Sequence, residues 1–492
     1  MKGSGVRSTV EVLAVLVVLS ASLWAATRQP GYPVPHVQGP TVPQSVAPGG
    51  PDFTLTVYGA NFILGSTVNW NRQPRATIYV SAHELQAQIL ASDITTNTAG
   101  MITVTTTSPN GPITSSTYFQ VEVHNPLRAM NPTNEIVYQG YGGFAVADLN
   151  NDNFLDLVGS PGSIGFSTVI SDRMNQGDGV FGSGWPLTDK EYPFANGGLC
   201  GDFNGDGNVD YMYMIGESRQ EVPAPLAVSF GNGDGTFSAG PTFGYFGNQF
   251  GPYDPDFVVG DFNQDGTLDV IAGMAFGHFV TFFGNGDGTF VEGWTTYGGD
   301  NSRFVVGDFN GDGKLDLLAS SQESTSRNGN QFDLNIFIGN GNGTFQPAQR
   351  IATIAVPVGD LGAPSYLVTD LNQDGKLDIV FSNFTGQVGI LLGNGDGTFQ
   401  SPVYYTVGSR FYFAFQVGDF NSDGNTDIIV QQNTNSTEFS ILLGNGDGTF
   451  QPKQKVNAGG FPGAVLTVGD FNNDGLLDFS TGGFAYYEYL QK

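Results

Sequence analysis

Residues 308–316 read DFNGDGKLD. The pattern Asp-x-Asn-x-Asp-Gly-x-x-Asp, or a variant with Asn at its sixth position, occurs seven times in the chain. We number these copies loops 1 to 7; they start at Asp148, Asp202, Asp261, Asp308, Asp370, Asp419 and Asp470. A loop that recurs with its acidic residues in fixed positions predicts one repeated structural unit.

The spacing of the loops predicts the size of that unit. Successive loops start 54, 59, 47, 62, 49 and 51 residues apart, which is the length that four short strands and their turns require. Each unit shows an apolar strand, the acidic loop, two further strands, a GNGDGTF-like turn and a fourth strand. The seventh unit stops after AYYEYL, and the unassigned strand EIVY at 135–138 precedes loop 1. We therefore predict a seven-bladed β-propeller whose N-terminal strand completes the last blade and removes an exposed edge.

The loops also predict a metal site. Calcium takes six to eight oxygen ligands, which a short loop supplies from side chains at positions 1, 3, 5 and 9 and a backbone carbonyl at position 7. Positions 1, 5 and 9 are Asp and position 3 is Asn in all seven loops, whereas position 7 has no common side-chain chemistry. Up to seven Ca²⁺ ions are therefore expected, and their role is expected to be structural.

The predicted metal ligands follow, loop by loop. They are Asp148, Asn150, Asp152, Phe154 and Asp156; Asp202, Asn204, Asp206, Asn208 and Asp210; Asp261, Asn263, Asp265, Thr267 and Asp269; Asp308, Asn310, Asp312, Lys314 and Asp316; Asp370, Asn372, Asp374, Lys376 and Asp378; Asp419, Asn421, Asp423, Asn425 and Asp427; and Asp470, Asn472, Asp474, Leu476 and Asp478.

Other loop positions carry separate predictions. Position 6 is Gly in six loops and Asn153 in loop 1, residue types that accept a positive φ at a sharp bend. Position 2 is Leu or Phe throughout and position 8 is mostly apolar, so both are expected to anchor the loop in the core. Position 4 is small or polar and is expected to face water. The GNGDGTF segments hold one carboxylate each, or Asn342 in the fourth, and are interpreted as turns without metal ligands.

These repeats resemble the FG-GAP and VCBS family, the propeller repeats of integrin α-chains and many exported bacterial proteins, over residues 135–492. Residues 40–124 contain short strands such as FTLTVYG and MITVTTT separated by turn residues, which predicts a small β-sandwich. The pieces VYGANF, VNWN and YFQVEV resemble the immunoglobulin-like IPT/TIG family, which implies a spacer or interaction module. Residues 27–39 and 125–134 are proline-containing and are expected to be linkers.

The N-terminus and the composition indicate where the protein acts. Residues 1–26 have Lys2 and Arg7, an apolar run from Val12 to Leu19 and small residues thereafter, the layout of a secretory signal peptide. We expect a secreted or cell-surface protein, and retention of this segment as an anchor stays open. The formal net charge of −28 argues against nucleic acid as a partner. The single cysteine, Cys200, aligns with valines of the other repeats and is interpreted as a core residue.

Three functions stay open at this stage. The first is a binding or adhesion module for an extracellular protein or carbohydrate, the second a polysaccharide lyase or esterase, and the third a structural module for surface assembly. No catalytic constellation is visible, because only His278 among four histidines falls within the repeats. The connections opposite the acidic loops vary most, so we predict the ligand face there. Its candidate residues are Tyr245, Phe246, Tyr253, Arg303, Arg410 and Tyr412.

Overall fold

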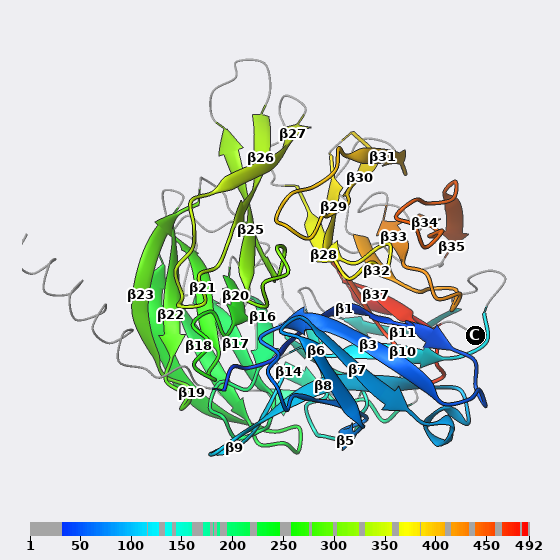
Figure 1. Ribbon diagram of the computed structural model, residues 1–492, viewed down its shortest axis with the longest axis horizontal. Coiled ribbons are helices and arrows are strands. Elements are labelled where there is room, and N and C mark those ends of the chain that lie inside the picture. The colour runs from blue at the N-terminus through cyan, green and yellow to red at the C-terminus, as the bar shows by residue number, and fades with distance from the viewer. Residues whose placement is uncertain are drawn as a thin grey trace, which may run out of the picture.

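The protein is described from a computed structural model (Figure 1). It describes residues 32–115, 117–126, 133–139, 144–159, 171–177, 181, 185–186, 194–216, 224–246, 257–274, 278–298, 303–323, 330–356, 364–383, 385–408, 415–431, 438–457, 465–482 and 485–490. Regular structure in these ranges is β-strand apart from one short 3-10 helix, η1 (Ala91–Ile94). The expected signal peptide lies outside them. Over the described ranges, no helix has the length and apolar character needed to cross a bilayer.

Residues 36–123 form two β-sheets around one apolar core, and we call this unit, together with the preceding residues 32–35, the N-terminal sandwich. One sheet has the order β1 (His36–Val42), β3 (Phe53–Ala60), β7 (Glu84–Ile89) and β6 (Thr77–Ser81). The other has the order β2 (Ser45–Val46), β10 (Phe119–Val123), β8 (Thr98–Ser108), β4 (Thr67–Trp70) and β5 (Gln73–Pro74), with β9 (Gly111–Thr114) paired to β8. Alternate residues of β3 face the core, as Leu55 and Val57 do beside Trp70. Strand β1 begins at His36, inside the segment expected to be a linker, because Val37 joins this core.

The other described strands form seven antiparallel sheets of four strands, which we number sheet 1 to sheet 7 after their loops. Their strands, in sheet order, are β12 (Phe144–Ala147), β13 (Asp156–Gly159), β14 (Ser171–Arg173) and β15 (Trp185–Pro186); β16 (Phe194–Gly201), β17 (Asp210–Gly216), β18 (Ala224–Gly231) and β19 (Phe237–Phe246); β20 (Phe257–Gly260), β21 (Asp269–Met274), β22 (His278–Gly284) and β23 (Phe290–Tyr297); β24 (Phe304–Gly307), β25 (Asp316–Glu323), β26 (Asn330–Phe337) and β27 (Gln349–Val356); β28 (Tyr366–Thr369), β29 (Asp378–Ser382), β30 (Gln387–Leu391) and β31 (Val403–Thr406); β32 (Phe415–Gly418), β33 (Asp427–Gln431), β34 (Glu438–Leu442) and β35 (Gln454–Asn457); and β36 (Val465–Gly469), β37 (Asp478–Gly482), β38 (Ala485–Leu490) and β11 (Thr133–Gln139).

Sheet 7 is built from both ends of the repeat region. Strand β11 pairs antiparallel with β38, with Val137 opposite Tyr487 and Gln139 opposite Ala485. The prediction that EIVY supplies the missing fourth strand is therefore confirmed. This pairing leaves β38 with a neighbour on each side, so it is not an exposed edge.

Neighbouring sheets pack against each other through their apolar faces. The first strands of successive sheets are in contact, as β12 is with β16 and β20 with β24. Sheets 1 and 7 also meet: the rings of Phe181 and Phe471 lie 5.8 Å apart, edge to face, and Asn175 Nδ2 donates to the Phe471 carbonyl at 2.6 Å. Figure 1 shows sheets 3 to 6 following one another from β20–β23 to β32–β35, with the sandwich strands β3, β7 and β8 below them.

Candidate metal loops and their cover

Each acidic loop connects the first and second strands of its sheet, as predicted. In loop 4, Asp308 Oδ1 accepts the backbone N–H groups of Gly311 and Asp312 at 2.7 and 3.2 Å, and Oδ2 accepts that of Gly313 at 2.7 Å. Asn310 Oδ1 accepts the Asp312 N–H at 2.9 Å, and Asp312 Oδ1 accepts the Lys314 N–H at 3.0 Å. Side-chain oxygens at positions 1, 3 and 5 thus satisfy N–H groups of a tight turn that makes few backbone–backbone bonds.

Two positions in every loop have a left-handed backbone. The predicted positive φ at position 6 is confirmed, with 78° at Gly313 and 72° at Asn153. Position 4 also has a positive φ, for example 59° at Gln264 and 54° at Ser422, which the sequence reasoning missed. The signal was present, because Gly and Asn occupy position 4 in four of the seven loops.

Position 9 has a structural task in addition to its predicted metal role. Asp316 is fully buried; its Oδ2 accepts the Phe309 N–H at 3.0 Å and its Oδ1 the Gly339 N–H at 2.8 Å. The loop is thereby joined to the end of the third strand. The pKa of Asp316 is raised to about 8, chiefly by burial and in part by the neighbouring carboxylates of Asp308 and Asp312, while the two N–H donors oppose the shift.

The chemistry of each loop fits a hard cation. Carboxylate and amide oxygens are the donors that calcium prefers, and an oxygen that accepts one N–H retains a second lone pair. Within the described ranges, no three His, Cys, Asp or Glu side chains lie together as a ready-made metal cluster. The amide at position 3 lies beside the carboxylate at position 5, as Asn204 Nδ2 does at 3.1 Å from Asp206 Oδ2. A metal site here would need the Asn oxygen and a backbone carbonyl as well as the carboxylates.

The GNGDGTF segments form turns. Asp287 Oδ1 accepts the backbone N–H of Thr289 at 3.0 Å and its hydroxyl at 2.5 Å, and Asn342 makes the same two bonds to Thr344. The Gly288 N–H donates to the carbonyl of Phe203 in loop 2, so the turn also joins neighbouring sheets. Asn342 therefore accepts the same two hydrogen bonds as Asp does at this turn position.

The N-terminal sandwich packs directly on the acidic loops. Among the described contacts, it touches loops 1, 3, 4, 5, 6 and 7, and several of these contacts use position 1. The Val34 N–H donates to Asp261 Oδ2 at 2.9 Å, and Ser45 Oγ donates to Asp419 Oδ2 at 2.7 Å. The buried Ser422 at position 4 donates to Glu122 Oε2 at 2.7 Å, so the expectation that position 4 faces water is wrong in loop 6.

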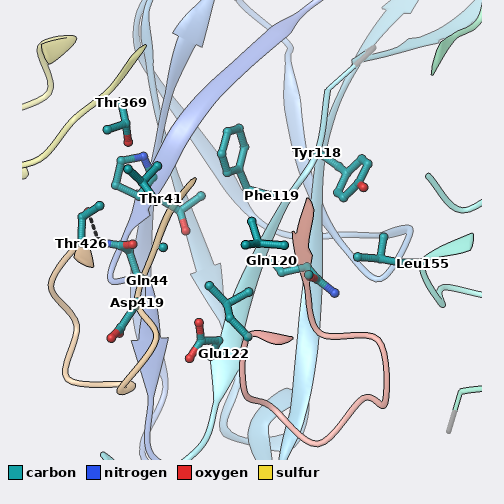
Figure 2. Close-up of a pocket in the computed structure, with 16 residues that line it drawn as sticks. Thr41, Gln44, Tyr118, Phe119, Gln120, Glu122, Leu155, Thr369, Asp419 and Thr426 are labelled. Atoms are coloured by element: carbon teal, nitrogen blue, oxygen red, sulfur yellow. Dashed lines mark hydrogen bonds between the residues drawn. The ribbon is translucent and has the colours of Figure 1, made fainter. Parts of the chain in front are cut away.

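A cavity of about 240 Å³ lies between the sandwich and the first strands of sheets 5 to 7 (Figure 2). Glu122, Gln120 and Phe119 of β10 line its sandwich side, and Asp419 lies opposite. Burial raises the pKa of Glu122 well above its usual value, and the charge of Asp419 adds to this effect. The loop face is therefore an internal surface at these sheets.

The predicted ligand face is only partly described. Arg303 precedes β24, and its guanidinium donates to Ser365 Oγ of sheet 5 at 3.4 Å, while its carbonyl accepts the Tyr366 hydroxyl. Arg303 thus makes a contact between sheets. The backbones of Tyr245 and Phe246 belong to β19, and Tyr253, Arg410 and Tyr412 lie outside the described residues.

Two other sequence predictions concern single residues. Cys200 lies on β16 and packs against a core cluster shared by sheets 1 and 2, and burial raises the pKa of its thiol to about 12. His278 is exposed on β22, with its ring 5.3 Å from that of Tyr297.

Comparison with known families agrees with the repeat pattern. The FG-GAP-like repeat family matches residues 202–272, 261–319, 370–430 and 419–479. Among curated proteins, none matches the chain.

Three solved structures illustrate the structural similarity. An auxiliary nutrient-binding protein from Bacteroides ovatus is 11% identical with a TM-score of 0.38, covering 94% of this chain and 100% of that chain. Periplasmic gluconolactonase PpgL of Pseudomonas aeruginosa is 16% identical with a TM-score of 0.40, covering 74% and 93%. The Tc holotoxin pore of Photorhabdus luminescens is 14% identical with a TM-score of 0.35, covering 79% of this chain but 19% of that chain, so this chain spans about a fifth of its length. At these identities and TM-scores the similarities carry no argument about function.

The repeated loops, the four-stranded sheets and the family match together define the class of protein. Residues 202–319 and 370–479 carry FG-GAP-like repeats, and the four-stranded antiparallel sheets support a β-propeller fold.

Proposed function

We propose that this protein is an exported, calcium-stabilised propeller of seven blades, with an immunoglobulin-like N-terminal sandwich, that acts as a binding or adhesion module. The observation that carries the proposal is the loop set: seven loops share the same oxygen side chains and the same two left-handed positions. Residues at positions 1, 3, 5 and 9 and the carbonyl at position 7 would hold calcium in each loop. The metal would neutralise carboxylates that burial and mutual repulsion otherwise penalise.

The calcium proposal is tested on the full chain by metal analysis and calorimetry. Protein dialysed against limiting calcium should retain calcium ions, and excess chelator should lower the melting temperature substantially. Magnesium at equal concentration should restore less stability, because it demands octahedral geometry and gives up water reluctantly. Equal melting in calcium and in chelator, with no metal retained, would remove the proposal.

The partner would bind at the ends of the sheets opposite the acidic loops. The sandwich occupies the loop side at six loops, which favours the opposite connections as the available binding surface. An extracellular protein or carbohydrate is the expected ligand class, and export is inferred from residues 1–26. A glycan array and a pull-down against cell-surface proteins, each in calcium and in chelator, would identify it. Calcium-dependent capture is expected; binding that is equal in chelator would separate recognition from the metal.

A catalytic role has no comparable support, since the matched repeat family names no reaction.

A further inference from the structure

A two-residue turn of the sandwich aims one arginine at loop 1. Strands β4 and β5 form a hairpin whose central residues, Asn71 and Arg72, have φ values of 47° and 62°. Two consecutive positive φ values are typical of a type I′ turn, which suits the twist of paired strands. The Met101 N–H donates to Asn71 Oδ1 at 2.7 Å, so the turn is tied to β8. The backbone of Arg72 is therefore held in place by the sandwich itself.

The guanidinium of Arg72 reaches the carboxylate at position 1 of loop 1. Its Nη2 lies 2.7 Å from Asp148 Oδ2, and its Nη1 donates to Asn151 Oδ1 at position 4. The Asp148 side chain is only 3% exposed, against 38% for Arg72. The charge of this buried carboxylate is thus balanced by a cation from another domain. The same oxygen, Asp148 Oδ2, also accepts the Asn153 N–H at 3.0 Å.

Loop 2 provides the contrast within the same molecule. It has the same residues as loop 1 at positions 1, 3, 5 and 9, yet in the described part of the chain no Lys or Arg forms an ion pair with Asp202 or Asp206. Gly205, Asp206 and Gly207 are exposed rather than covered. The lysines at position 7 of loops 4 and 5 do form ion pairs within their own loops. Their partner is the half-exposed Asp at position 5 rather than the Asp at position 1, as Lys314 Nζ shows at 3.0 Å from Asp312 Oδ2.

We propose that Arg72 is the resident counter-cation of loop 1, so that docking of the sandwich, rather than calcium, neutralises Asp148. This inference rests on the proposed calcium binding of the other loops. A fixed positive charge beside a ligand carboxylate opposes the approach of a divalent cation. Loop 1 consequently binds calcium more weakly than loop 2, and the sandwich and calcium compete for the same charge.

The test compares calcium uptake of the full chain with and without this charge. The wild type, Arg72→Gln, Arg72→Lys and Arg350→Gln are dialysed against a series of calcium buffers, and bound calcium is measured. Arg72→Gln should take up about one more calcium per chain at limiting free calcium, with that site filling at an approximately tenfold lower concentration. Arg72→Lys should resemble the wild type because it keeps the charge. Arg350, which pairs with Asp333 on the outer strands of sheet 4, is a control for charge removal away from the loops. Identical uptake by the wild type and Arg72→Gln would overturn the inference.

A second measurement separates this inference from the proposed function. If no variant retains calcium, the calcium proposal fails. The role of Arg72 as the counter-cation of Asp148 is then tested by the melting temperature in chelator. Arg72→Gln should then lower the melting temperature in the wild-type background but not in an Asp148→Asn background. Equal losses in the two backgrounds would show that Arg72 does not act as the counter-cation of Asp148.

Discussion

The substitution Asp316→Asn tests whether position 9 holds the fold together without metal. The carboxylate accepts two buried N–H groups, from Phe309 and Gly339, one on each oxygen. An Asn side chain accepts on its oxygen only and directs its NH₂ group at the other N–H. One charge-assisted hydrogen bond is lost and two buried donors face each other, which costs about 3–5 kcal/mol. With an unfolding entropy of about 2 cal/mol/K per residue, a ring of this length should melt roughly 4–7 °C lower.

The assay is differential scanning calorimetry of the full chain in excess chelator at about pH 9, above the pKa of about 8 of Asp316. The carboxylate is then ionised, and no effect can come from lost calcium. Asp287→Asn is the matched control, because Asn342 occupies the equivalent turn position with the same hydrogen bonds. That control should melt within about 1 °C of the wild type. If Asp316→Asn also melts like the wild type in chelator, position 9 is a metal ligand only and the structural role is wrong.

Three further predictions follow from the same contacts. Burial raises the pKa values of Asp156 and Asp210 to about 7. Since the pKa of each carboxyl is higher in the folded state than in the unfolded state, its contribution to the free energy of unfolding is complete below the unfolded pKa and is lost as the pH rises toward 7. The melting temperature in chelator should therefore fall between pH 5 and pH 8, and calcium should restore more at pH 8; a chelator curve that rises over this range would contradict the assignment. Gly475→Ala should destabilise the protein more than Gly207→Ala in urea titrations. Both glycines have a φ of 86°, but a Cβ at 475 would meet the Val123 carbonyl oxygen at 2.6 Å, whereas nothing lies within 4 Å of a Cβ at 207. Equal losses of stability would mean that the sandwich moves away from the new Cβ without loss of stability. Deletion of 133–139 should lower the melting temperature and promote self-association, measured by light scattering, because it exposes the edge of β38; a monomer with unchanged melting would refute the shared sheet.

The sequence predicted the repeated features of the ring because each repeat is an independent copy of the same evidence. Seven aligned copies identify position 6 as left-handed, and they identify position 2 as a core anchor, as the buried Phe420 and Phe471 show. The strand at 135–138 could be assigned to the last sheet because the seventh unit lacked one strand. Local pattern and repeat count were sufficient for these predictions.

Contacts between the sandwich and the loops could not be predicted in this way. Each occurs once, between residues far apart in sequence, such as Ser45 with Asp419 or Arg72 with Asp148. Nothing in the pattern of the sandwich shows that its Val34 N–H will meet a carboxylate more than two hundred residues later. The double role of position 9 was missed for a related reason: an Asp that accepts two N–H groups and an Asp that binds metal have the same signature in sequence.

The pairing of β11 with β38 sets the order in which the molecule can be completed. The sandwich and β11 leave the ribosome before the other sheets, yet β11 cannot pair with β38 until residues 485–490 are made. Until then the row of sheets is incomplete, and the two sheets at its ends have apolar faces that no neighbouring sheet covers. Exposed apolar faces favour association between incomplete chains. The sandwich is already present during this interval and can receive loops 1 and 3 to 7 as they emerge. A domain that is synthesised before the sheets, and that contacts loops of sheets 1 and 7 alike, would thus act as a template that holds the incomplete propeller in place until β38 is made.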